Sequence, residues 1–196
     1  MKQALKKNGE KKYTWQDYLT WPDEERWEVI DGEAYDMTPS PTAKHQRIVT
    51  NFGRILGNKL TGGPCATFAA PLDVYLDDNN FVQPDVMVIC DEKKIKDKVY
   101  GAPDLIIEVL SPSTSLKDKK EKRVLYEKFG VKEYIIVHPE EMFIERYRLE
   151  KSRYKEPDIL GAEDVLKLSC LEDIEVSLWE VFEVEPPVKD SNNGVV

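Results

Sequence analysis

Two short apolar stretches decide the fold of this chain: Val82-Gln83-Pro84-Asp85-Val86-Met87-Val88-Ile89-Cys90 and Asp104-Leu105-Ile106-Ile107-Glu108-Val109-Leu110. Both are rich in Val and Ile, so both predict buried strands. Each carries an acidic residue where a core strand normally has none. Asp85 stands at the start of the first run, and Glu108 stands inside the second. The interval between them leaves room for one strand, a connection and a neighbouring strand.

An ionised carboxylate on a buried strand is costly unless it is paired or bound to a metal. Two of them on adjacent strands predict an oxygen-ligand site for a hard divalent cation. The structural alternative is a strand-end turn aspartate and a core glutamate paired with one lysine. For Asp85 or Glu108 alone this alternative is favoured; for the pair, together with the motifs below, the metal site is favoured.

Length and composition predict one globular domain. The chain has 196 residues, of which 41% are hydrophobic and 33% are charged. We expect a flexible arm over residues 1–12, a single domain over residues 13–185 and a disordered tail over residues 186–196. The net charge of −9 argues against a broadly basic surface that coats nucleic acid. It leaves a nucleic-acid enzyme open, because a metal site is itself acidic.

The cysteines and the N-terminus predict a cytoplasmic protein. Cys65, Cys90 and Cys170 are far apart and lack metal-binding spacing, so we expect reduced thiols and neither a disulfide framework nor a zinc site. The basic N-terminus is not followed by an apolar segment, so no signal peptide is predicted. No apolar run is long enough to predict a membrane span.

Local patterns place the remaining elements. Asp31-Gly32 between two apolar runs predicts an N-terminal β-hairpin, and the apolar spacing over residues 41–60 predicts a helix. That helix carries His45, and a lone histidine is more often structural than catalytic. Short strands, a hairpin and a terminal helix are predicted over residues 66–70, 72–76, 133–137, 142–154 and 178–182.

A second helix is predicted from about Ser115 to Phe129, with its end at Gly130. Asp118, Lys122 and Tyr126 are spaced by four residues on this helix, so they share one face.

The combined motifs resemble a known family. The matching residues are Trp27 to Glu33, His45, Pro84-Asp85-Val86, Ile107-Glu108-Val109-Leu110-Ser111-Pro112-Ser113-Thr114, Asp118, Lys122, Tyr126 and Gly130-Val131-Lys132-Glu133-Tyr134. Over roughly residues 14 to 183 the chain resembles the restriction endonuclease family that is common in cyanobacteria and belongs to the PD-(D/E)xK nuclease superfamily. The Glu-Val-Leu-Ser-Pro-Ser-Thr string is the most specific part.

The resemblance implies an α/β (α+β) fold, in which a restriction-endonuclease-like mixed β-sheet is flanked by helices. It implies that Asp85 and Glu108 are metal ligands on adjacent strands and that Glu28 is a further acidic member. The lysine that many superfamily members carry two residues after the second acid is Leu110 here. Lys122 matches a lysine that this family supplies from the following helix.

One further departure concerns His138, which stands where the family usually has Asp. We interpret this change as peripheral.

The chemistry accounts for these residue types. Mg²⁺ or Mn²⁺ held by Asp85 and Glu108 would activate a water molecule and neutralise charge on a phosphodiester. Lys122 is the best candidate to orient or deprotonate that water, with His45, Asp118 and Tyr126 in supporting positions. Lys119 and Lys120 compete for this role. The structural alternative for Lys122 is a salt bridge with Asp118 on a solvated helix face.

The sequence therefore predicts a divalent-metal-dependent DNA endonuclease, with Asp85, Glu108 and Lys122 as catalytic residues. The alternative is a catalytically weak or inactive nuclease-fold protein that acts in nucleic-acid binding or assembly. A weaker third hypothesis is a small-molecule phosphodiesterase. We also expect a homodimer, because two-fold dimers are the commonest assemblies and cutting both strands needs two sites; the aromatic residues Trp15, Trp21, Trp27 and Trp179 are the sequence basis.

Overall fold

The computed structural model describes residues 11–22, 24–37, 41–111, 118–172 and 174–188. Most of the predicted arm and tail therefore lies outside the described residues. The helices are α1 (Trp15–Tyr18), α2 (Ala43–Leu60), α4 (Arg123–Phe129) and α5 (Leu178–Phe182), with shorter turns η1 (Glu92–Lys94), η2 (Asp118–Lys122) and η3 (Ser169–Leu171). The strands are β1 (Trp27–Ile30), β2 (Glu33–Asp36), β3 (Ala66–Ala69), β4 (Val74–Asp77), β5 (Asn80–Val82), β6 (Val86–Ile89), β7 (Val99–Tyr100), β8 (Leu105–Val109), β9 (Glu133–His138), β10 (Phe143–Glu150), β11 (Arg153–Tyr154), β12 (Asp158–Gly161), β13 (Val165–Leu168) and β14 (Ile174–Ser177).

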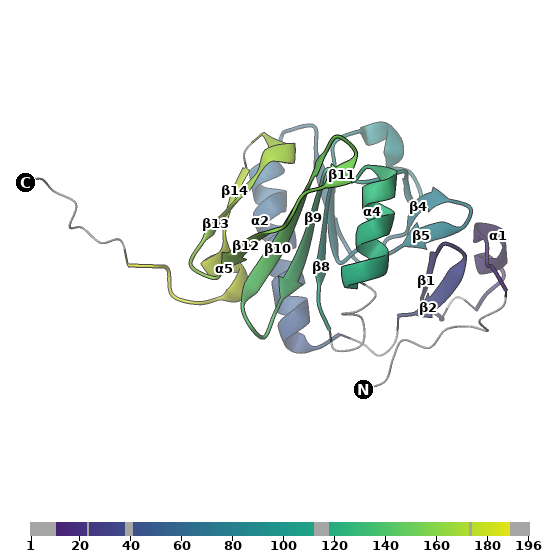
Figure 1. Ribbon diagram of the computed structural model, residues 1–196, viewed down its shortest axis with the longest axis horizontal. Coiled ribbons are helices and arrows are strands. Elements are labelled where there is room, and N and C mark those ends of the chain that lie inside the picture. The colour runs from purple at the N-terminus through teal and green to yellow at the C-terminus, as the bar shows by residue number, and fades with distance from the viewer. Residues whose placement is uncertain (1–10, 23, 38–40, 112–117, 173, 189–196) are drawn as a thin grey trace, which may run out of the picture.

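A mixed sheet forms the centre of the molecule. Its strand order is β11-β10-β9-β8-β6-β3, with β12 also paired to β10. Strands β8 and β9 are parallel, and β6 is antiparallel to β8. Helix α2 lies on one face of this sheet and α4 on the other (Figure 1). This arrangement confirms the predicted mixed sheet flanked by helices.

Side-chain alternation along β8 divides the core between the two faces. Ile107 and Val109 pack with α2, whereas Ile106 packs with Leu125 and Tyr126 on the α4 side. Glu108 follows the second set, so its carboxylate points beneath α4 rather than toward α2.

A second sheet, ordered β2-β1-β5-β4-β7, carries the N-terminal hairpin. Asp31 and Gly32 both have positive φ, at 47° and 76°, between the paired residues Ile30 and Glu33. This is the two-residue turn that Asp-Gly favours, so the predicted hairpin is confirmed.

The stretch 82–90 is not one strand, as the sequence predicted, but two strands in different sheets. Strand β5 belongs to the second sheet and β6 to the central sheet. Pro84 lies between them and has no N–H to donate, so it cannot continue a strand ladder. Asp85 therefore lies in the link, immediately before β6, at the point where the chain passes from one sheet to the other.

The predicted helix over 41–60 is confirmed as α2, whose first turn is capped by the Thr42 side chain. The predicted helix over 115–129 is described from Asp118 on: this part comprises the π-helical turn η2 and α4, and it ends at Gly130 with φ 81°. The sequence prediction missed β7, β12, β13 and β14. These strands are only two to four residues long, so each offers too little of the strand pattern to be recognised from sequence.

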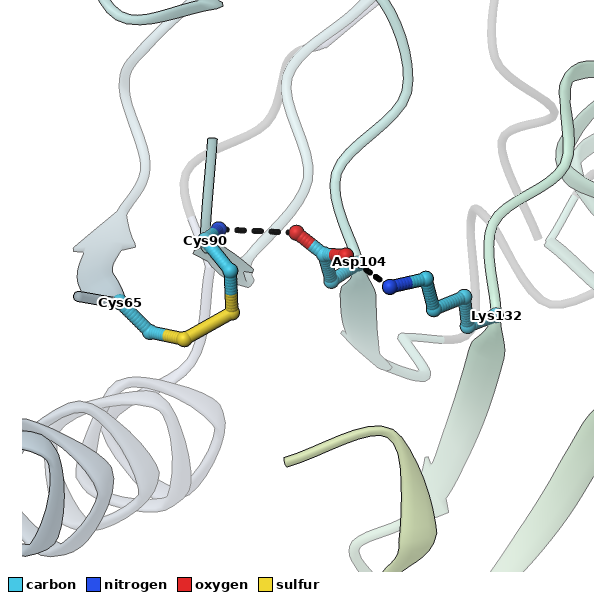
Figure 2. Close-up of a disulfide and its surroundings, with 4 residues drawn as sticks. All are labelled: Cys65, Cys90, Asp104 and Lys132. Carbon is cyan, nitrogen blue, oxygen red and sulfur yellow. Dashed lines mark hydrogen bonds and ion pairs between the residues drawn. A yellow bond between two sulfur atoms is a disulfide. The ribbon is translucent and has the colours of Figure 1, made fainter. Parts of the chain in front are cut away.

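Two of the three cysteines form a disulfide, so the prediction of reduced thiols is wrong for them. Ala66 pairs with Ile89 across β3 and β6, and the next pair in this register is Cys65 and Cys90. Their Cα atoms are 3.9 Å apart (Figure 2). The sequence prediction considered only cysteines at the short spacings typical of metal sites. The antiparallel pairing of β3 with β6 instead joins two cysteines that are 25 positions apart. Cys170 remains a thiol, and burial raises its pKa.

Beside the disulfide, Asp104 joins the ends of three strands. Its Oδ2 accepts a hydrogen bond from the Cys90 N–H at 2.8 Å, and its Oδ1 lies 2.7 Å from Lys132 Nζ (Figure 2). Burial acts to raise the pKa of Asp104, but the hydrogen bonds from Lys132 and Cys90 together hold it below its ordinary value. Asp104 is thus an ionised strand-end aspartate with a structural role.

None of the helices in the described ranges combines the length and the apolar character needed to cross a membrane.

Candidate active site

The pairing of β6 with β8 brings Asp85 to Glu108. Val86 pairs with Ile107 in antiparallel register, so Asp85 and Glu108 form the next opposed pair. Asp85 Oδ2 accepts a hydrogen bond from the Val109 N–H at 2.8 Å. The two acidic residues that the sequence singled out therefore stand opposite each other at one end of β6 and β8.

The first turn of α2 places His45 next to Asp85. His45 Nε2 lies 3.2 Å from Asp85 Oδ2, and the His45 side chain is nearly buried. The turn is fixed because the His45 N–H donates to Thr42 Oγ1. The histidine that the sequence left between a structural and a supporting role thus contacts one of the predicted ligands.

Glu108 belongs to a buried cluster, which we define as Glu28, Glu108, Lys122 and Tyr126. Lys122 Nζ lies 2.7 Å from Glu108 Oε1 and 2.8 Å from Glu28 Oε1. The Tyr126 hydroxyl donates to the same Glu108 oxygen at 2.8 Å. Exposed fractions of the side chains are 0% for Glu28, 2% for Lys122 and 4% for Glu108. One ammonium group therefore lies between two carboxylates that water barely reaches.

The position of Lys122 rules out the alternative of a salt bridge on a solvated face. Lys122 ends η2, and Tyr126 follows one α-helical turn later, so both side chains point inward at Glu108. Lys120 is exposed. The side chains of Asp118 and Lys119 lie outside the described residues, so the predicted roles of these two stay untested.

A second layer of polar residues holds the cluster, and the sequence analysis missed it. The Gln83 N–H donates to Glu28 Oε1 at 2.9 Å, and its side chain bonds to Arg26 and Asp73. Burial raises the pKa of Asp73. The available signal was a glutamine inside an otherwise apolar run, directly before Pro84-Asp85.

The carboxylate oxygens at this end of β6 and β8 suit a divalent cation, although in this structure two of the carboxylates bind the Lys122 ammonium. In the described parts of the chain, no three His, Cys, Asp or Glu side chains gather in a metal-binding arrangement. Glu28 and Glu108 share Lys122, whereas Asp85 stands opposite Glu108 in the strand register and contacts His45. Carboxylate oxygens are the ligands that Mg²⁺ and Mn²⁺ prefer. Glu28 and Glu108 are both bridged to Lys122, so a metal ion bound by Glu108 would have to displace that ammonium group.

His138 lies at the end of β9 and contacts β10. Its Nε2 is 2.8 Å from Glu145 Oε1, and its ring stacks on Phe143 with 3.9 Å between centroids. By strand alternation His138 shares the α4 side of the sheet with Glu108, and its described contacts are with β10 rather than with the buried cluster.

Comparison with known proteins supplies the family. Residues 15–179 match the model of a family described as "Uma2: Putative restriction endonuclease". Two similar proteins of Synechocystis sp. (strain ATCC 27184 / PCC 6803 / Kazusa) are named "Uncharacterized protein slr1290" and "Uncharacterized protein sll1609". The first is 33% identical over 57% of this chain and 60% of its own length, and the second is 30% identical over 58% and 66%. The chain thus spans less than two thirds of either relative.

A solved structure is similar in fold. It is described as the crystal structure of a putative nuclease belonging to DUF820 from Anabaena variabilis ATCC 29413. The TM-score is 0.73 at 21% identity, over 87% of this chain and 97% of that one. At this identity the likeness shows the fold, whereas the match to the family model covers most of the sequence. The chain therefore belongs to the Uma2 family of restriction-endonuclease-like proteins.

Proposed function

We propose that this protein is a divalent-metal-dependent endonuclease that hydrolyses DNA phosphodiester bonds at the site formed by Asp85, Glu108 and Lys122. The observation that supports it is the buried lysine, held at 2.7 and 2.8 Å from two buried glutamates beside Asp85. Burying three charged groups is costly, and perturbed charged groups concentrate at functional sites. Membership of the family supports a nuclease over other enzyme classes.

Each residue has a proposed task. Asp85 and Glu108 would hold Mg²⁺ or Mn²⁺, which supplies an activated water and neutralises developing charge when bound. His45 fixes the Asp85 carboxylate, and Tyr126 fixes that of Glu108. Lys122 positions the attacking water or the phosphate through its ammonium group, and Glu28 holds Lys122 in the buried cluster.

The alternative is a nuclease-fold protein that binds nucleic acid or assembles without cutting. Two observations favour it: Leu110 occupies the usual lysine position, and the Lys122 ammonium is already engaged by both glutamates. A protein of this kind would bind DNA with unchanged affinity when Glu108 is replaced and would release no cleaved product.

Incubation with plasmid, linear duplex, single-stranded DNA and RNA tests the function directly. We expect nicked or linear DNA with Mg²⁺ or Mn²⁺ and none with a chelator. Retention of DNA without cleavage under every metal condition would support the alternative, and cleavage of only small diesters would indicate a phosphodiesterase.

Metal binding is tested separately by melting temperature. We expect Mn²⁺ to raise the melting temperature of the wild type, because a ligand of the folded state stabilises it. The shift should vanish in Asp85→Asn and persist in Asp104→Asn. The two aspartates are matched, since each accepts a backbone N–H at 2.8 Å across the same strand pair. Equal shifts in both variants would remove Asp85 from the ligand set.

A homodimer and a cytoplasmic location remain proposals. Trp15, Trp21 and Trp27, part of the sequence basis for the dimer, pack against one another and against Phe81 within one chain. Sedimentation at micromolar concentration decides the first proposal, with a single monomer species as the contrary result.

A further inference from the structure

A pocket of about 470 Å³ opens on the α1 side of the second sheet. Its walls include the rings of Trp15, Tyr18 and Trp21 from α1 and the residues after it, and the side chains of Asp73 and Gln83. Val29 of β1 packs into the aromatic cluster on this side, so strand alternation places Glu28 on the opposite side. The pocket therefore opens on the other side of β1 from Glu28 and, among the described residues, shares only Gln83 and Asp73 with the polar layer around the buried cluster. The inference drawn from it does not depend on nuclease activity.

The aromatic wall is a preformed surface. Ring centroids are 5.2 Å apart for Trp15 and Tyr18 and 5.6 Å apart for Tyr18 and Trp21, in tilted and edge-to-face arrangements. Such contacts hold rings in fixed orientations. A rigid wall of indole and phenol rings attracts a cation through the negative faces of the rings.

The wall already holds one cation of the chain itself. Lys98 Nζ lies 4.8 Å from the centroid of the Trp15 ring. Asp97 secures it at 2.6 Å, and that hydrogen bond is the main reason why the Lys98 pKa is raised. The pocket lining also contains a second aromatic ring and a second carboxylate, those of Tyr18 and Asp73.

The charge of the lining selects the ligand. The described lining holds the carboxylates of Glu25, Asp73 and Asp97 and the ammonium of Lys98, which pairs with Asp97. Asp73 Oδ1 accepts a hydrogen bond from the neutral Gln83 amide at 2.8 Å. Arg26 donates to the oxygen of the same amide and, like Lys98, partly offsets the charge of Asp73, so the lining keeps a modest excess of negative charge. An anion such as a phosphate is disfavoured here, and a positively charged group is favoured.

We propose that this pocket binds an organic cation, with an alkylammonium or guanidinium group lying against Tyr18 and Trp21 and donating to Asp73. Aromatic walls and a carboxylate recognise such groups by cation–π attraction and a charge-assisted hydrogen bond. Lys98, which lies over the neighbouring Trp15 ring, competes with the ligand for the charge of Asp73, whose pKa it acts to lower.

Titration of tryptophan fluorescence with spermidine, arginine amide and tetramethylammonium tests the proposal. We expect saturable binding of at least one probe, weakened about tenfold by Asp73→Asn, the factor for one charged hydrogen bond. Asp36→Asn on β2, outside the lining, is the matched control and should bind as the wild type does. Comparison of the probes distinguishes an alkylammonium from a guanidinium ligand.

A second variant is expected to change the ligand affinity in the opposite direction. Lys98→Ala removes the resident competitor and should tighten binding, whereas Lys59→Ala on α2 should leave affinity unchanged. Circular dichroism confirms that each variant is folded. The proposal is overturned if none of the probes saturates the fluorescence, if Asp73→Asn and Asp36→Asn weaken binding equally, or if adenosine binds in preference to every cation.

Discussion

Replacing Lys122 with methionine should lower the free energy of unfolding by about 3 to 5 kcal/mol. Methionine keeps most of the volume of lysine but removes the charge. Glu28 and Glu108 would then face each other, buried and without the ammonium that lies 2.8 and 2.7 Å from them. Urea unfolding at neutral pH measures the loss. From the sequence, a solvated salt bridge of at most about 1 kcal/mol was the alternative, and the observed burial predicts the larger value.

Two companion variants make this test specific. Lys120→Met removes an exposed lysine of the same helical turn and should change stability by less than about 1 kcal/mol. Adding Glu28→Gln and Glu108→Gln to Lys122→Met should recover much of the loss, because the unpaired charges are gone. Equal effects of Lys122→Met and Lys120→Met would contradict the buried cluster. Loss of cleavage in a Lys122 variant is therefore informative only at temperatures where that variant is folded.

Loss of the Cys65–Cys90 disulfide should lower the free energy of unfolding by about 3 kcal/mol. The bond closes a loop of 25 residues, and constraining a loop of this length in the unfolded chain accounts for that magnitude. The measurement compares wild type and Cys65→Ala/Cys90→Ala in denaturant. Reductant should destabilise the wild type and leave the double variant unaffected.

A thiol count gives an independent reading of the same bond. Unfolded protein purified under oxidising conditions should show one reactive thiol, that of Cys170, and three after reduction. Three thiols before reduction would contradict the disulfide and would support the reduced, cytoplasmic protein expected from the sequence.

The sequence was sufficient for features that local pattern encodes. The Val/Ile content of two short apolar runs located β6 and β8, and an acidic residue in each run singled out Asp85 and Glu108. The spacing of four residues between Lys122 and Tyr126 predicted their shared helix face, and both do meet Glu108.

What the sequence did not supply depends on contacts between distant segments. Nothing near Lys122 indicates that its second partner is Glu28, which comes from the N-terminal hairpin. Cys65 and Cys90 are joined only through the register of β3 with β6. Residues 82–90 look like one strand by composition, but Val82 pairs in the second sheet and Val86 in the central sheet, with Pro84 in the link between them. In each case tertiary pairing, rather than local propensity, determined the outcome.

The rate of DNA cleavage in a matched pair of variants tests the central claim most directly. Glu108→Gln alters the proposed ligand, whereas Glu145→Gln alters a carboxylate two strands away in the same sheet that is bonded to His138 and Tyr147. With Mn²⁺ or Mg²⁺, we expect wild type and Glu145→Gln to cleave at similar rates. Glu108→Gln should be slower by at least about a hundredfold. Cleavage by Glu108→Gln at the wild-type rate would contradict an active site at this end of β6 and β8.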